Sequence, residues 1–401
     1  MKILFHHRIA SADGQFVHLT ELVRALRAAG HEVLIVGPHL SEGSSLGQTS
    51  GLVNRLKKLL PGALYEVLEF AYSAVALWRL GRAARSFRPD LIYERYNLHL
   101  HAGRFVAGAL GVPLVLEVNA PLTEERSAWG KLRLKRFAAW SDRRIWRGAD
   151  YVLPVTDALA DYVRAAGVAE ERIVVVPNGV DLQMYPADGT QRERARRRLG
   201  LQDRVVLGFT GFVRDWHGLP QIIDFVAERP DLPIQLLIVG DGLDRARLEA
   251  RINELGISGR ARITGFVPRE DIPDYISAFD IALQPAVTAW ASPLKLFEYL
   301  AAGCAVIAPD TPNIREVLTH EKNALLFDPD DAGQLIDRLR RLYEEPQLRR
   351  ALGQQARQLV IERPYTWEHN AHLVAGLASG KRLPAAERTQ TTPPRSSGRP
   401  V

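Results

Sequence analysis

The segment from residue 291 to residue 303 holds the side chains best suited to chemistry. Ser292 is a good helix N-cap, and Pro293 suits the first position of a helix. The backbone N–H groups of Leu294 and Lys295 would then lie unpaired at the helix start. Because the helix dipole also favours negative charge there, this segment predicts an anion site suited to a diphosphate.

Two charged side chains extend that site. Lys295 adds a full positive charge at the helix start, and Glu298 follows about one turn later on the same face. A carboxylate at this position could accept hydrogen bonds from the hydroxyls of a ribose. The alternative is an ordinary capped helix with a surface Lys–Glu pair, and the helix alone does not decide between the two.

Other residues are weaker candidates for chemistry. Asp328 and Asp330 form an Asp-x-Asp pattern that can hold a metal, but their place between a strand and a helix favours a turn and an N-cap. No metal site is therefore expected. His99 and His101, together with Arg95, could line an acceptor site, although a structural role is the preferred interpretation.

The elements that must position these residues alternate between strand and helix. In the first half, strands are expected at Ile3–His6 and His31–Val36, with a helix at His18–Ala29 between them. The rhythm restarts at Val205–Phe209, and helices are expected from Ala332 to about residue 379. Such a rhythm predicts parallel sheets with right-handed crossovers.

Two domains follow from this pattern and from the length of 401 residues. The expected limits are 1–185 for the first domain and 186–375 for the second, with an arginine-rich stretch, Asp188–Arg198, near the boundary. Further strands are expected in the first domain, Ile173–Val176 among them. Residues 381–401 are poor in apolar side chains and are expected to be disordered.

The composition is that of an ordinary globular protein, with 46% hydrophobic and 24% charged residues. The only cysteine, Cys304, lies in an apolar segment and is expected in the core, so a reducing, cytoplasmic location is favoured. The start of the chain does not resemble a signal peptide, and no apolar run approaches the ~20 residues of a membrane helix.

The net charge of +6 is less informative than the clustering of basic residues. Arg55, Lys57 and Lys58 precede an apolar-rich stretch, Ala63–Leu80, and a second cluster lies among tryptophans. That cluster comprises Lys131, Arg133, Lys135, Arg136, Arg143, Arg144 and Arg147, near Trp129, Trp140 and Trp146. This mixture suits an anionic membrane surface. The alternative is a solvated helix face whose tryptophans pack inward, and nucleic acid is not expected as a partner.

Several motifs occur in the order and spacing of GT-B glycosyltransferases. They are Gly211–Gly218, Gly240–Gly242, Gly265–Val267 and Ser292–Gly303, and together they resemble the retaining family four. Pro177–Asp181 is similar to the interdomain motif of that family. The resemblance implies an α/β fold of the GT-B type, with two Rossmann-like, doubly wound domains that face a central cleft.

The resemblance also implies roles for individual residues. Glu298 resembles the carboxylate that binds the donor ribose, and Arg214 the cation beside the donor pyrophosphate. Val267 matches a backbone contact to the base, and Gly14 the glycine of the first loop, which approaches the phosphate; a simple strand–helix turn is the alternative for Gly14. The expected donor-binding residues are thus Gly14, Gly218, Val267, Ser292, Leu294, Lys295 and Glu298, and the expected catalytic residues are Arg214, Lys295 and Asn119.

Three positions depart from the family pattern. Trp290 stands where a glutamate is usual, His217 where a lysine is usual, and Asn119 at the histidine position of a motif in the first domain. Asn119 can hydrogen-bond a sugar hydroxyl but cannot act as a base. The Ser-Pro-Leu-Lys form of the helix start resembles one branch of the family, so Lys295 could supply the charge that His217 lacks.

The activity implied is retaining transfer of a sugar from a UDP- or GDP-linked donor to a glycan, lipid-linked or small-molecule acceptor. Neither a cofactor nor a metal is expected. A peripheral position at the inner face of a membrane is one interpretation of the basic, tryptophan-containing helices, and the solvated helix face is the other. Two alternatives stay open: a sugar-nucleotide epimerase of the same fold, and a degenerate member that binds nucleotide without catalysis.

Overall fold

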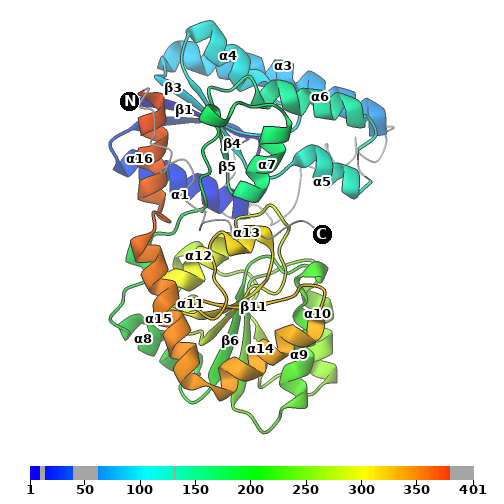
Figure 1. Ribbon diagram of the computed structural model, residues 1–401, viewed down its shortest axis with the longest axis vertical. Coiled ribbons are helices and arrows are strands. Elements are labelled where there is room, and N and C mark those ends of the chain that lie inside the picture. Colours follow the sequence, from blue (N-terminus) through cyan, green and yellow to red (C-terminus); the bar gives the residue numbers. More distant parts are fainter. Residues whose placement is uncertain (10–13, 39–61, 131, 380–401) are drawn as a thin grey trace, which may run out of the picture. The chain divides into compact units, whose positions relative to one another are not determined.

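A computed structural model describes residues 1–9, 14–38, 62–130 and 132–379 (Figure 1). Two compact units make up the chain. The first contains Met1–Pro177, Trp290–Ser292 and the chain from Trp367 onward, and the second contains Asn178–Ala289 and Pro293–Thr366. The tail expected at 381–401, Lys131 and the basic residues at 55–58 lie outside the described residues.

A five-stranded parallel sheet forms the centre of the first unit, in the order β2-β1-β3-β4-β5. Its strands are β1 (Lys2–His6), β2 (Glu32–Val36), β3 (Leu91–Arg95), β4 (Leu114–Val118) and β5 (Tyr151–Pro154). The strands β3 and β4 are buried at every residue, as expected of a sheet covered on both faces. The expected strand Ile173–Val176 is not a strand of the sheet: the segment joins β5 through one isolated bridge, Ile173 to Val152, and through the backbone N–H groups of Val174 and Val176, which donate to Val152 and Pro154.

Helices cover both faces of this sheet. The connection β1-α1-β2 steps along the sheet in one direction, and β2-α3-β3 steps back past β1, so right-handed crossovers place α1 and α3 on opposite faces. The helices of the unit are α1 (Gly14–Ala28), α3 (Gly62–Phe87), α4 (Ala102–Leu110), α5 (Leu122–Ala128), α6 (Lys135–Trp146), α7 (Asp157–Ala165) and α16 (Trp367–Ala378).

The second unit is built on a six-stranded parallel sheet in the order β11-β10-β9-β6-β7-β8. Its strands are β6 (Val205–Thr210), β7 (Ile234–Val239), β8 (Ala261–Ile263), β9 (Ile281–Leu283), β10 (Ala305–Pro309) and β11 (Leu325–Phe327). The order of strands reverses direction between β6 and β9, and this switch point is where doubly wound folds bind their ligands.

The helices of the second unit are α8 (Thr190–Leu199), α9 (Leu219–Glu228), α10 (Arg245–Glu254), α11 (Ile272–Ser277), α12 (Leu294–Ala301), α13 (Pro312–Arg315), α14 (Ala332–Glu344) and α15 (Pro346–Glu362). The arginine-rich stretch expected near the boundary is helix α8. Arg192 and Arg196 of this helix pair with Asp280 at 2.6 and 2.9 Å, so its charge serves packing within the unit.

The division of the chain differs from the expected limits in two respects. The units separate after Pro177 rather than after residue 185, and α16 belongs to the first unit rather than the second. Helix α16 packs against α1 and buries Trp367, Leu373 and Val374. These apolar contacts explain why the end of the chain joins the first sheet, which a linear pattern of strands and helices cannot reveal.

Candidate functional site

Helix α12 begins directly after the loop that follows β9, at the switch point of the second sheet. Its N-cap is Pro293, with φ −71° and ψ 121°, and not Ser292 as expected. Because the backbone of Pro293 is still extended, the helix starts one residue later, at Leu294. No side chain caps this start, so its first N–H groups have no side-chain acceptor from the N-cap residue.

Lys295 lies in the first turn of α12 and points toward the end of β6. Its Nζ is 3.8 Å from the centroid of the Phe209 ring and forms neither a hydrogen bond nor an ion pair with any residue that the structure describes. Burial lowers the pKa of Lys295 to about 7, against the opposing influence of Glu298. An ammonium group placed in this way is short of a negative partner.

The end of β6 is tied to α12 by a buried hydroxyl. Tyr299 Oη accepts a hydrogen bond from the backbone N–H of Thr210 at 2.8 Å and lies 3.1 Å from Thr210 Oγ1. Tyr299 is one turn beyond Lys295 on the same helix. This bond therefore holds the start of α12 in a fixed position relative to the loop that begins at Gly211.

Glycines let the loops after β6 and β7 come together. A Cβ atom at Gly240 would lie 2.1 Å from the carbonyl oxygen of Gly211, and one at Gly242 would lie 2.0 Å from that of Val213. The backbone N–H of Val213 also donates to the carbonyl oxygen of Asp241 at 2.8 Å. The two expected glycine motifs thus form one close-packed backbone surface next to Lys295.

Arg214 and His217 lie on the first of these loops and differ in charge. Arg214 is exposed, and its guanidinium is 5.0 Å from the Phe212 ring centroid. Burial, together with the nearby charges of Lys295 and Arg214, lowers the pKa of His217 to about 3. His217 Nδ1 accepts the backbone N–H of Arg214 at 3.2 Å, so a neutral imidazole shapes the loop and adds no charge. Gly218 follows with φ 67°, a value that favours glycine.

Glu298 is buried and paired with Arg269, a residue that the sequence did not single out. Arg269 belongs to a short 3₁₀ helix, Arg269–Asp271, that directly follows Val267 and Pro268. Val267 packs against the hydrophobic core of the unit. The expected ribose carboxylate and the expected base contact therefore lie close together, linked by an arginine that no motif marks.

Two of the expected site residues, Gly14 and Asn119, belong to the first unit. Gly14 is the first residue of α1 and is exposed. Asn119 follows β4 and donates from Nδ2 to Glu117 Oε1, which also accepts from Arg95. Glu117 Oε2 accepts from Tyr93 Oη at 2.5 Å and lies 2.8 Å from His18 Nε2. The donor-site role of Gly14 and the catalytic role of Asn119 stay predictions.

The pKa of Glu117 is well below its usual range. Burial alone would raise it, but the proximity of His18 and Arg95 and the hydrogen bonds from His18 and Tyr93 outweigh that effect. Arg95 is itself buried in this network. Its guanidinium donates to Glu117, so in this structure Arg95 helps to hold the buried network together.

Trp290, which replaces a usual glutamate, packs within the first unit. Its carbonyl oxygen accepts a hydrogen bond from Thr156 Oγ1 at 2.9 Å, and its ring meets Tyr162 edge-on, with the centroids 6.5 Å apart. Its side chain packs against the core of that unit. The tryptophan therefore supplies apolar contact at a position where a carboxylate would contribute charge.

The weaker candidates take structural positions. His99 is fully buried and stacks on Phe137, with the ring centroids 5.2 Å apart, and His101 lies 3.1 Å from Ser141 Oγ. Burial lowers the pKa of both histidines, to about 4 for His101. Cys304 is a core residue, and burial raises the pKa of its thiol to about 12.

The Asp-x-Asp pattern forms a turn, as expected. Asp328 Oδ1 accepts the backbone N–H of Asp330 at 3.0 Å, while Asp331, not either of these residues, caps α14 by accepting from Gly333 and Gln334. Over the described ranges, no three His, Cys, Asp or Glu side chains gather as metal ligands would, and no helix has the length and apolarity needed to cross a bilayer.

Comparisons with known proteins cover both units. Residues 13–179 match the model of the glycosyl transferase 4-like domain, and residues 191–359 match that of glycosyl transferases group 1. The 2-deoxystreptamine glucosyltransferase of Streptomyces kanamyceticus is 28% identical in an alignment of 382 residues that covers 90% of this chain and 96% of the relative. A GDP-mannose-dependent alpha-mannosyltransferase of Mycobacterium tuberculosis is 27% identical, over 80% of this chain and 81% of its own length.

A solved structure has the same fold. Anabaena Alr3699/HepE, in complex with UDP-glucose, superposes with a TM-score of 0.72 at 21% identity, over 95% of this chain and all of that chain.

Proposed function

The chain is a GT-B glycosyltransferase with a glycosyl transferase 4-like and a group 1 domain, and we propose that it transfers a sugar with retention of configuration from a UDP- or GDP-linked donor. The proposal includes a glycan, lipid-linked or small-molecule acceptor, and catalysis without a metal. A relative whose name specifies GDP-mannose and a neighbour in complex with UDP-glucose support this choice of nucleotides. The reducing location expected from the single cysteine supports a cytoplasmic enzyme.

One observation carries the proposal. The ammonium group of Lys295 lies at an uncapped helix start, beside a glycine surface at the switch point of the sheet, and forms no hydrogen bond or ion pair with an acidic side chain among the described residues. A diphosphate at this point would receive the helix-start N–H groups and the charge of Lys295. Arg214, exposed on the adjoining loop, would supply a second charge.

These groups have a clear part in the reaction. As the bond between the anomeric carbon and the diphosphate breaks, negative charge develops on the leaving phosphate oxygen, and preorganised cations stabilise it. The diphosphate itself could accept the acceptor's proton, so the absence of a histidine at position 119 does not prevent transfer. Removing one such cation should slow transfer about one hundredfold.

The test is binding of nucleotides followed by product analysis. UDP, GDP, ADP and several nucleotide sugars are screened by thermal shift with and without EDTA, using Lys295→Ala and Glu298→Ala as variants. We expect one nucleotide to stabilise the wild-type protein equally with EDTA, and neither variant to respond. The anomeric configuration of the product is then read by NMR. Inversion, or a requirement for metal, would refute the corresponding part of the proposal, and isomerised free sugar would point to an epimerase.

A further inference from the structure

The first half of helix α3 has its polar and apolar faces reversed for a helix that covers a sheet, whereas the second half buries Ala76, Leu80 and Ala84 in the usual way. Its only two acidic residues, Glu66 and Glu69, are buried at 2% and 8% exposure. Large apolar side chains in the same turns face outward. A helix on the surface of a soluble domain normally shows the opposite arrangement.

Both buried glutamates accept hydrogen bonds from neighbouring segments, and these bonds fix the orientation of α3. Glu66 accepts the backbone N–H groups of Arg133 and Leu134 at 2.6 and 2.8 Å, which satisfies donors at the start of α6. Glu69 forms a two-bond pair with Arg126, at 2.7 and 2.9 Å. Turning α3 to bury its apolar side would leave these carboxylates and donors unpaired, at a large cost.

The outward side of α3 carries a continuous apolar stripe. We use the name outer stripe for Leu64, Val67, Leu68, Val75 and Trp78, which are 46, 48, 46, 42 and 63% exposed. Their spacing of three, four and seven residues places them along one side of the helix, over four turns. A stripe of this length on one helix marks an interaction surface rather than scattered apolar residues.

Basic residues flank the outer stripe at both ends. Arg79, Arg82 and Arg85 are exposed on the last turns of α3, and the guanidinium of Arg82 is 5.9 Å from the Trp78 ring centroid. At the other end, the Arg133 side chain packs against Gly62, the first residue of α3.

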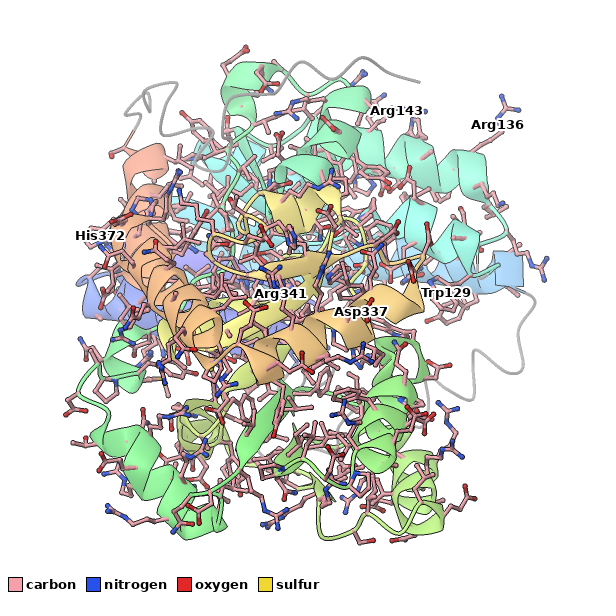
Figure 2. The ribbon with its side chains drawn as sticks, turned by 60° about the horizontal axis from the view of Figure 1, so that its bottom comes forward. Trp129, Arg136, Arg143, Asp337, Arg341 and His372 are labelled. Atoms are coloured by element: carbon pink, nitrogen blue, oxygen red, sulfur yellow. The ribbon has the colours of Figure 1, made fainter. Side chains whose placement is uncertain are left out.

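The second basic end continues into α6. Lys135 and Arg136 follow Arg133 and are exposed, and Figure 2 shows Arg136 and Arg143 projecting away from the helices. The exposed positions of α3 carry no acidic residue, since both of its glutamates are buried. The surface is therefore apolar in the middle and positive at both ends.

We propose that α3 lies in the plane of an anionic lipid bilayer, with the outer stripe among the acyl chains and the flanking basic residues on lipid phosphates. An amphipathic helix with tryptophan on its apolar side and arginines beside it binds in this way. A second copy of this chain fits less well, because α3–α3 pairing in either direction would bring one basic end against another. The proposal goes beyond sugar transfer and uses none of the residues around Lys295.

The test is flotation of the full chain with two kinds of vesicle. One is pure phosphatidylcholine, and the other also contains about 30% of the anionic lipid phosphatidylglycerol. Val67→Ser/Trp78→Ser removes two of the five apolar side chains of the outer stripe, including its most exposed one. Leu243→Ser/Ile361→Ser is the matched control, since these residues of the second unit are 90 and 55% exposed. Arg82→Gln/Arg85→Gln removes two charges. Thermal denaturation checks that each variant folds.

We expect binding to anionic vesicles at low salt, about tenfold or more weaker in Val67→Ser/Trp78→Ser and unchanged in the control. Each arginine removed should weaken binding about fivefold, and raised salt should reduce it further. The proposal would be overturned if the wild-type protein did not bind the vesicles, or if the control variant lost binding equally. It would also be overturned if the protein were a dimer in solution that the same serine substitutions dissociated. Nucleotide binding is measured in parallel. Loss of nucleotide binding alone would count against the donor site, and loss of vesicle binding alone would count against the membrane proposal.

Discussion

Lys295 makes donor binding depend on pH in a way that can be calculated. Burial places its pKa at about 7, whereas only the protonated side chain attracts a diphosphate. A bound diphosphate favours the charged form and raises the pKa of Lys295 above that value. Binding above pH 7 must therefore take up a proton, and the affinity must fall as pH rises.

The expected size of the effect follows from the fraction of protein that is ready to bind. Lys295 with a pKa of about 7 is about nine-tenths protonated at pH 6 and about one-tenth at pH 8. Because the apparent dissociation constant varies inversely with that fraction, it should rise about tenfold between these two pH values. His217, with a pKa of about 3, stays neutral over the whole range and adds nothing.

The assay is isothermal titration calorimetry with a nucleotide sugar rather than a free nucleotide. The terminal phosphate of UDP or GDP has a pKa of about 6, so it would titrate in the same pH range as Lys295. Both phosphates of a nucleotide sugar are esterified and do not titrate there. Buffers of different ionisation enthalpy count the protons taken up. Lys295→Arg is the matched control, since its charge is permanent and its profile should be flat. A flat wild-type profile, or the same slope in Lys295→Arg, would refute the reasoning.

Three further changes have definite expected outcomes. Lys295→Met should raise the melting temperature at pH 7, by about 2–4 °C for each kcal/mol gained in a unit of this size, because the folded state then no longer disfavours a proton that the unfolded chain holds; donor binding should be lost. Gly240→Ala, with its Cβ 2.1 Å from a carbonyl oxygen and φ 143°, should lower the free energy of unfolding by about 3 kcal/mol in urea titrations, whereas Gly259→Ala, with open space around it, should change little. Glu117→Gln should cost about 3 kcal/mol at neutral pH, measured in the same way. Since the pKa of Glu117 is depressed in the folded state, this difference should be present above the unfolded-state pKa of about 4.3 and shrink as the pH falls below it.

The residues of the candidate site were predictable where a local rule governs them. Lys295 and Glu298 share a helix, so the period of the helix places them on one side of it, and the glycine motifs mark the loops that approach each other. The helix start was displaced by one residue, because Ser292 and Pro293 are both acceptable N-terminal residues and the choice depends on the loop before them.

Residues that depend on long-range contacts were not predictable. Arg269 reaches Glu298 only because the chain folds back through α11, β9 and the loop after it, and no spacing along the chain links the two residues. The inward position of Glu66 and Glu69 was missed for the same reason, since it depends on donors 57–68 residues away. The fold class needed only the alternation of strands and helices, whereas the place of α16 required knowledge of which apolar surface remained uncovered.

The return of α16 to the first sheet also has a consequence for how the protein is made. A ribosome releases the five strands of the first unit early, but the helix that packs against α1 emerges only after the whole second unit has been synthesised. The second unit can therefore complete its core while the first still exposes the apolar side of α1. During that interval the nascent chain presents a surface that a chaperone can hold, and the domain that begins first is the one that finishes last.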